Sequence, residues 1–173
     1  MKIIFLTVAA TFALAFSGRS AESIVKLSEV HLCCQGCVKG AQTAIGKVPG
    51  ATLTADRDAE TVTIAGPDTA TVQKAANALV AAGYFGKSSD SSIKLSADSG
   101  ASGKKVQSVK LEGVHLCCGK CVTAVDKAVK SVSGVKGHTA VKNAKSFEVT
   151  GDFNDQEVID ALNKAGLTGK VAK

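Results

Sequence analysis

The sequence predicts an α+β protein built from two similar halves, and three observations support this fold class. A cysteine-rich heptad, His31–Cys37 (HLCCQGC), returns as His115–Cys121 (HLCCGKC). Before each heptad the apolar residues alternate with a period of two, as in a strand, and after it they recur on one helical face. In each half the pattern then continues through two strand-like segments, a second helix-like segment and a short final strand.

The first strand of each half is predicted around Val25–Leu27 and Val109–Leu111, where apolar and polar residues alternate. The apolar residues that follow fall out of phase with the strand in both halves. This shift predicts a bulge or bend before each cysteine loop, with the strand ending at about Leu32 in the first half. The residues out of phase are Val30, Leu32, Val114 and Leu116.

Two helices per half are predicted, each followed by a glycine that is typical of a helix end. The first begins near the last cysteine of each heptad and ends before Gly50 or Gly134. The second covers residues 70–82 or 154–165 and ends before Gly83 or Gly166. The intervening strands are expected at residues 51–55, 61–65, 135–141 and 146–150, and short final strands at 85–88 and 168–171.

The order strand, helix, strand, strand, helix, strand is that of the ferredoxin-like arrangement, with two helices on one face of an antiparallel sheet. We therefore predict two tandem ferredoxin-like βαββαβ sandwiches, at residues 22–88 and 106–173. Residues 89–105 are rich in Ser, Gly, Asp and Lys, which predicts a flexible linker between the two domains.

Residues 1–20 have the pattern of a secretory signal peptide. Lys2 precedes an uncharged apolar run, Ile3–Phe16, and small residues suited to cleavage follow. The run is shorter than the ~20 residues that a membrane span needs, and no later segment could cross a bilayer. An uncleaved N-terminal anchor is the alternative. We expect a periplasmic or secreted protein with no stable membrane span after signal cleavage.

Composition narrows the function classes. The formal net charge is +6, and the excess of lysine lies in residues 106–173. Such a surface could attract nucleic acid, an anionic membrane or an acidic partner. Without a basic run interleaved with aromatics, we favour a solvated lysine face and expect no nucleic-acid partner. Met1 is the only methionine, which excludes a Met-rich copper site. No nucleophile elbow, phosphate loop or His-rich zinc motif supports an enzyme.

All six cysteines of the chain lie in the two heptads. Cys34 is expected in the loop and Cys37 in the first helical turn, so that both sulfurs can converge on one ion; Cys118 and Cys121 repeat this spacing. A helix N-terminus supplies positive potential, which favours the metal-binding thiolate over the thiol. Thiolates select soft ions, so Cu(I) is the ion we expect, with Zn(II) and Hg(II) as alternatives.

Four further residues of the heptads could be ligands. Cys33 and Cys117 could add a third sulfur and favour three-coordinate Cu(I), or they could be small buried apolar residues or disulfide partners. His31 and His115 could supply nitrogen, but we favour solvent-facing strand positions for both. Lys120 is expected to reinforce thiolate formation in the second loop by its charge.

At this point the chain resembles the heavy-metal-associated (HMA) domain family, the small ferredoxin-like modules of copper chaperones, metal-pumping ATPases and the periplasmic mercury-binding protein. The family shows Gly-Met-x-Cys-x-x-Cys after its first strand, and Leu32–Cys37 and Leu116–Cys121 match with Leu at the Met position. The resemblance extends to segments similar to the family's third strand and to its final helix and turn. These are Thr61–Gly66, Phe147–Gly151, Ala78–Tyr84 and Ala161–Leu167.

The resemblance implies that the metal-binding cysteines are Cys34, Cys37, Cys118 and Cys121. Two departures from the family pattern concern the choice of ion more than the fold. An extra cysteine precedes each pair, and the glycine before the motif is displaced or replaced. The residues concerned are Cys33, Cys117, Gly113 and Glu29.

Taken together, these features predict an exported protein that binds a soft metal ion, copper before others, and sequesters or transfers it. A metal-transport protein or a membrane pump is the expected partner. One alternative is a thiol–disulfide oxidoreductase, because a Cys-x-x-Cys pair at a helix start also lowers a thiol pKa in redox enzymes. Another is a non-catalytic module whose cysteines form structural disulfides.

Overall fold

The computed structural model describes residues 22–96 and 98–172. The predicted signal peptide, residues 1–20, lies outside the described residues. Within the described ranges, no helix combines the length and apolar character that a membrane crossing requires.

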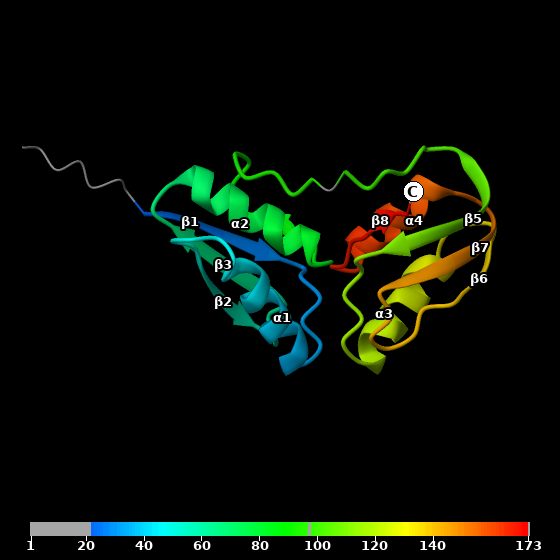
Figure 1. The fold of residues 1–173 in the computed structure, drawn as a ribbon, viewed down its shortest axis with the longest axis horizontal. Coiled ribbons are helices and arrows are strands. Elements are labelled where there is room, and N and C mark those ends of the chain that lie inside the picture. The colour runs from blue at the N-terminus through cyan, green and yellow to red at the C-terminus, as the bar shows by residue number, and fades with distance from the viewer. Residues whose placement is uncertain (1–21, 97, 173) are drawn as a thin grey trace, which may run out of the picture.

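Each half of the chain folds into a four-stranded antiparallel sheet with two helices, and the fold is α+β as the sequence predicts. The strand order is β2-β3-β1-β4 in the first half and β6-β7-β5-β8 in the second. Figure 1 shows the two lobes side by side. The elements are β1 (Ser23–Ser28), α1 (Gln35–Ile45), β2 (Thr52–Asp56), β3 (Thr61–Gly66), α2 (Thr69–Ala81), β4 (Lys87–Ser88), β5 (Lys105–Glu112), α3 (Gly119–Lys130), β6 (Val135–His138), β7 (Ser146–Asn154), α4 (Asp155–Lys164) and β8 (Lys170–Val171).

The bend expected before each cysteine loop is present, and it shortens the first strand. β1 ends at Ser28, and the next residue, Glu29, has a φ of 59°; at the same place in the second half, Gly113 has a φ of 76°. Both values lie in the left-handed region, which turns the chain out of the sheet. The prediction that β1 continues to about Leu32 is therefore wrong, and residues 29–34 form a loop.

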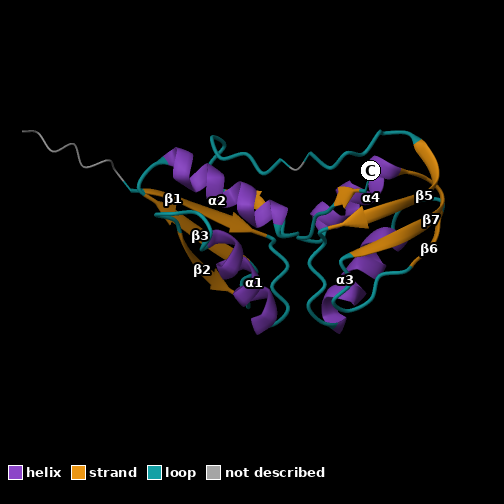
Figure 2. Cartoon of the chain, in the orientation of Figure 1, coloured by secondary structure: helices purple, strands orange, loops and turns teal. Residues whose placement is uncertain are grey.

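One face of each sheet is apolar and is covered by the helices. Burial alternates along β1 and β3, so that every second side chain points into the core. Figure 2 shows α1 and α2 on one side of the first sheet, and α3 and α4 on one side of the second. Fully buried core residues include Leu27, Ile64, Leu79, Leu111, Val149 and Leu162. The two cores hold the ends of β1 and β5, and thus the cysteine loops, on rigid elements.

The two halves meet along the loops that follow α2 and α4. Tyr84 and Leu167 form an antiparallel bridge. On either side of it, the Phe85 N–H donates to the Gly166 carbonyl (3.1 Å) and the Thr168 N–H donates to the Gly83 carbonyl (3.0 Å). This exchange of equivalent hydrogen bonds brings the two cysteine loops to face each other at the centre of the molecule (Figure 1).

The segment between the halves is held at both ends by specific contacts. In the predicted linker, Ile93 is buried, and Gln73 of α2 exchanges two hydrogen bonds of 2.8 Å with the backbone of Lys94. Near the start of β5, the buried Asp155 carboxylate accepts hydrogen bonds from the Ser102 N–H and hydroxyl (2.7 and 2.8 Å) and from the Gly103 N–H (2.8 Å). The segment is therefore tied to α2 and to α4.

We expect Asp155→Ala to lower the free energy of unfolding by about 2–3 kcal/mol, because it removes the charged acceptor of three hydrogen bonds. Burial alone would raise the pKa of Asp155, but the donors of Ser102 and Gly103 outweigh it and lower that pKa. Its stabilisation is therefore complete above the unfolded pKa of ~3.9 and is lost as the pH falls through the folded value. Urea titration at several pH values measures this. The exposed Asp160→Ala in the same helix is the control; an equal loss there would contradict the assignment.

Candidate metal centre

Each cysteine pair is positioned by the N-terminus of a helix. Cys34 is the N-cap of α1 and Cys118 the N-cap of α3, both with extended backbones. Their carbonyls accept the first helical hydrogen bonds, from Cys37 N–H (3.0 Å) and Cys121 N–H (3.1 Å). The second cysteine of each pair therefore lies in the first turn, where free N–H groups and the helix dipole favour a thiolate.

All six sulfurs gather into one group between the halves, which we call the six-sulfur cluster. Its members are joined by Sγ–Sγ contacts of 3.4–3.8 Å. Cys37 and Cys121 lie at its centre, 3.8 Å apart and buried, and the other four cysteines are half-buried. These distances are far longer than a disulfide bond of ~2.05 Å, and all six cysteines are free thiols.

The shortest contact in the cluster joins one half to the other, and its counterpart with the halves exchanged is nearly as short. Cys33 lies 3.4 Å from Cys118, and Cys34 lies 3.5 Å from Cys117. The sequence leaves open whether the halves bind ions separately or share them, because periodicity within one half does not show how two halves dock. The structure brings every cysteine that the sequence singles out to one place.

The second-half histidine is tied to the first half through Tyr84. The rings of Tyr84 and His115 stack with centroids 4.5 Å apart, and the Tyr84 hydroxyl lies 3.0 Å from His115 Nε2. That hydroxyl also donates to the Cys37 carbonyl (2.7 Å). Because its single proton is used there, the Tyr84 oxygen accepts from Nε2–H, which assigns the tautomer of His115. Sequence reasoning missed Tyr84, whose position after Gly83 indicates only a helix end.

His31 occupies the corresponding place in the first half but lacks such a partner. The residue that matches Tyr84 in the second half is Leu167, which has no hydroxyl, and His31 Nε2 is buried without a hydrogen-bond partner among the described residues. Burial lowers the pKa of His31 and so favours the neutral ring. Contrary to the expectation of solvent-facing strand positions, His31 and His115 are half-buried in loops beside the sulfurs.

The pKa values of the cysteines in the cluster are shifted in opposite directions, so that some favour the thiolate and others the thiol. Contact with Cys121 lowers the pKa of Cys37, and the same contact raises that of Cys121, since the two sulfurs compete for one proton. Burial raises the pKa values of Cys33 and Cys117. The Cys121 N–H lowers the pKa of Cys118 to about 6. A soft cation that displaces the remaining protons would stabilise the whole group.

Lys120 acts on Cys118 in a different way from the one expected. Its side chain is exposed, and its backbone N–H, at the start of α3, contributes to lowering the pKa of Cys118. The second loop thus favours a thiolate through the N–H groups of the helix start, which are available to any residue type at this position.

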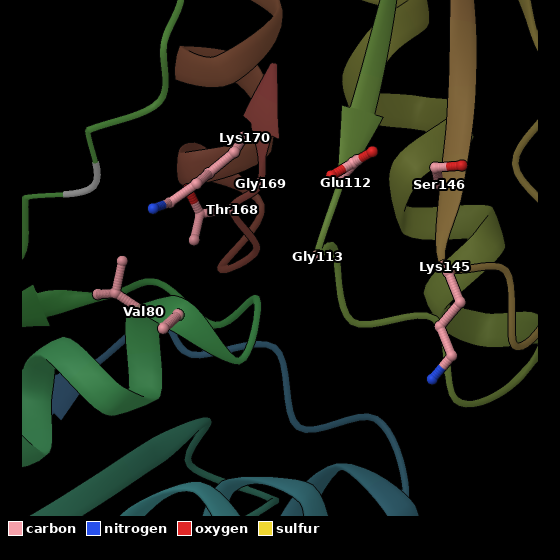
Figure 3. Close-up of a pocket in the computed structure, with 9 residues that line it drawn as sticks. Val80, Glu112, Gly113, Lys145, Ser146, Thr168, Gly169 and Lys170 are labelled. Carbon is pink, nitrogen blue, oxygen red and sulfur yellow. The ribbon is translucent and has the colours of Figure 1, made fainter. Parts of the chain in front are cut away.

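Two cavities lie at the junction. One, of about 320 Å³, is lined by residues of the second cysteine loop, including His115 and Cys117, together with Asn143, and reaches the cluster from outside. The other, of about 480 Å³, is shown in Figure 3 and is lined by Val80 of α2 and by second-half residues that include Lys145 and Lys170. Only the first of these two offers a route to a cysteine.

We expect Tyr84→Phe to lower the free energy of unfolding of the metal-free protein by about 1–3 kcal/mol, because it leaves the Cys37 carbonyl and His115 Nε2 without their partner. A double-mutant cycle with His115→Phe isolates the contact. In the Tyr84→Phe background, His115→Phe should cost clearly less than in the unmodified protein. Equal costs in both backgrounds would show that the two side chains do not interact.

No protein-family model and no curated protein matches the chain. Similar solved structures include the N-terminal domain of PacS from Synechocystis PCC6803, with 24% identity over 39% of this chain and 100% of that chain (TM-score 0.36). A copper binding domain from HMA7, a P-type ATPase, has 15% identity over 39% and 96% (TM-score 0.36). The N-terminal soluble domains of Bacillus subtilis CopA have 15% identity over 88% and 95% (TM-score 0.31).

The chain resembles heavy-metal-associated domains. At such identities and TM-scores, however, the likeness decides nothing about activity. Function has to be inferred from the six-sulfur cluster and its surroundings.

Proposed function

We propose that this protein binds a soft metal ion, Cu(I) before Zn(II) or Hg(II), through its six-sulfur cluster. The observation that carries this proposal is the convergence of six free thiols, within contacts of 3.4–3.8 Å, at the N-termini of α1 and α3. Thiolate ligands of this kind select soft ions, and helix N-termini favour their ionised form. In this proposal the protein is a metal-binding module and not an enzyme.

We further infer that the two halves are tandem copies of one unit, because they share their element order, strand order and cysteine heptad. The signal-peptide pattern of residues 1–20 supports export to the periplasm or the cell exterior. In this setting the protein would sequester the ion or transfer it to a metal-transport protein or a membrane pump.

Transfer would proceed by ligand exchange. A partner's thiolate binds the ion, and a cluster thiolate then leaves it, so that one metal–sulfur bond forms and one breaks without a change in oxidation state. The half-buried sulfurs, those of Cys33, Cys34, Cys117 and Cys118, are the ones that a partner can reach first. The buried Cys37 and Cys121 would be the last sulfurs to release metal.

Competition between the reduced protein and a Cu(I) chelator tests the proposal. Outer-shell changes around metal sites cost 10–100-fold in affinity, so loss of two ligands in Cys34→Ser/Cys118→Ser should cost at least about 100-fold. Thr43→Ser/Thr123→Ser, at exposed positions of the same helices, is the matched control and should bind normally. Absence of Cu(I) binding by the unmodified protein, or binding indifferent to the cysteine changes, would eliminate this function.

Thiol–disulfide exchange is a second candidate, favoured by one observation. Cys118 has a pKa lowered to about 6 and lies 3.4 Å from Cys33. A thiolate next to a second thiol is the arrangement that redox enzymes use. Turnover in an insulin-reduction assay would support this candidate, and its absence alongside tight Cu(I) binding would leave metal binding alone.

A further inference from the structure

The contacts of the six-sulfur cluster close into triangles, and the outermost triangles combine sulfurs from both halves. The first joins the pair of the first half to a cysteine of the second. Cys34 and Cys37 lie 3.8 Å apart, and Cys117 lies 3.5 Å from each of them.

The second outer triangle is the counterpart of the first, with the halves exchanged. Cys118 and Cys121 lie 3.8 Å apart, and Cys33 lies 3.4 Å from Cys118 and 3.6 Å from Cys121. An ion at the centre of such a triangle would be about 2.1 Å from each sulfur, close to the ~2.3 Å of a metal–thiolate bond. Either triangle therefore fits a three-coordinate ion with small adjustments.

The inner triangles cannot be filled at the same time as the outer ones. Each consists of Cys37 and Cys121 with either Cys33 or Cys117, so that it shares a side with the neighbouring outer triangle. Ions in two triangles that share a side would lie about 2 Å apart, closer than a metal–thiolate bond of ~2.3 Å. Filling the two outer triangles uses all six sulfurs and shares none.

Each histidine also lies near a buried cysteine of the other half. A ring nitrogen of His115 lies within 4.8 Å of the sulfurs of Cys37, Cys117 and Cys121, and a ring nitrogen of His31 lies within 4.8 Å of those of Cys33 and Cys121. Each half thus extends the histidine and the first cysteine of its heptad toward the Cys-x-x-Cys pair of the other half.

We propose that each Cys-x-x-Cys pair is completed by the first cysteine of the other half, so that the chain holds two three-coordinate Cu(I) ions in crossed sites. This inference rests on the proposed function and assigns a role to Cys33 and Cys117, which a two-sulfur site would not need. Because each ion is bound by both halves, loading with metal also fastens the halves together.

Two variants of the full chain with equal numbers of cysteines test the crossing. Cys34→Ser/Cys37→Ser/Cys117→Ser keeps one crossed site, made of Cys33, Cys118 and Cys121. Cys33→Ser/Cys34→Ser/Cys37→Ser keeps the three cysteines of the second half. Both are titrated with Cu(I) against a chelator, and X-ray absorption gives the number of sulfur ligands.

We expect the unmodified protein to bind two Cu(I) ions, each with three sulfur ligands. The crossed variant should bind one ion with three sulfurs, and the single-half variant should bind at least tenfold more weakly with two. Equal affinity and coordination in the two variants would overturn the crossing. So would a single bound ion, or two-sulfur coordination, in the unmodified protein. This second measurement does not depend on whether the variants fold. Failure of the unmodified protein to bind Cu(I) would instead refute the proposed function.

Discussion

Replacing Gly83 and Gly166 by alanine should separate the two halves and weaken Cu(I) binding by at least tenfold. Both glycines have a positive φ, 88° and 74°, which costs other residues ~1–2 kcal/mol each. A Cβ at Gly83 would also collide with the Gly113 carbonyl and the His115 N–H, and a Cβ at Gly166 with the backbone of Glu29 and His31. Because these contacts are all to backbone of the other half, the halves have to move apart.

The effect should be confined to the junction. Each half has its own sheet and helices, so far-UV circular dichroism should change little. Small-angle scattering should report a larger radius, and chelator competition a weaker affinity. Gly119→Ala is the control, since a Cβ there meets nothing within 4 Å although the residue follows Cys118 directly. A double alanine variant with unchanged dimensions and affinity would show that close docking is not needed for binding.

Alkylation of the reduced, metal-free protein at pH 7 should occur first at Cys118 and much more slowly at its neighbour Cys117. The pKa of Cys118 is lowered to about 6 by the Cys121 N–H, whereas burial raises that of Cys117. An ordinary cysteine has a pKa of ~8.5, so at pH 7 Cys118 should be mostly thiolate while Cys117 is almost entirely thiol.

The pH dependence of the Cys118 alkylation rate shows in which direction the pKa of this thiol is shifted. Because the pKa of Cys118 is lowered, its alkylation rate should rise as the pH passes about 6 and level off above 7, instead of rising through ~8.5. Iodoacetamide labelling followed by peptide mass spectrometry measures both cysteines in one sample. Loading with Cu(I) should protect Cys118. A midpoint near 8.5, or equal rates at the two cysteines, would contradict the electrostatic description of the helix start.

The elements of the fold could be predicted because each depends on local pattern. The period of two in β1 and β5 and the helical spacing after the heptads reflect burial on one face, which neighbouring residues determine. The bend before each cysteine loop could be predicted for the same reason. Its sharpness could not, because the left-handed φ of Glu29 leaves no mark on the apolar period, and β1 therefore ends earlier than expected.

The residues of the candidate site could be predicted from the sequence, but their arrangement in space could not. Cysteine spacing and helix starts place sulfurs in pairs, and both are local properties. The contacts of Cys33 with Cys118 and of Tyr84 with His115 depend on how two preformed halves dock. From the sequence, Gly83 and Gly166 indicate only helix ends; their second role, close approach to the other half, depends on tertiary packing.

The exchanged hydrogen bonds around Tyr84 and Leu167 have a consequence for how such a chain could arise. A residue of one half contacts a residue of the other, and the equivalents of these two residues make the same contact with the halves exchanged. Such reciprocal contacts are the isologous geometry of a twofold-symmetric homodimer. If the halves are the tandem copies that we propose, a single unit would carry both surfaces and would self-associate through them. Fusion of two such units would then free Tyr84 and Leu167 to diverge, and the two proposed metal environments would become inequivalent.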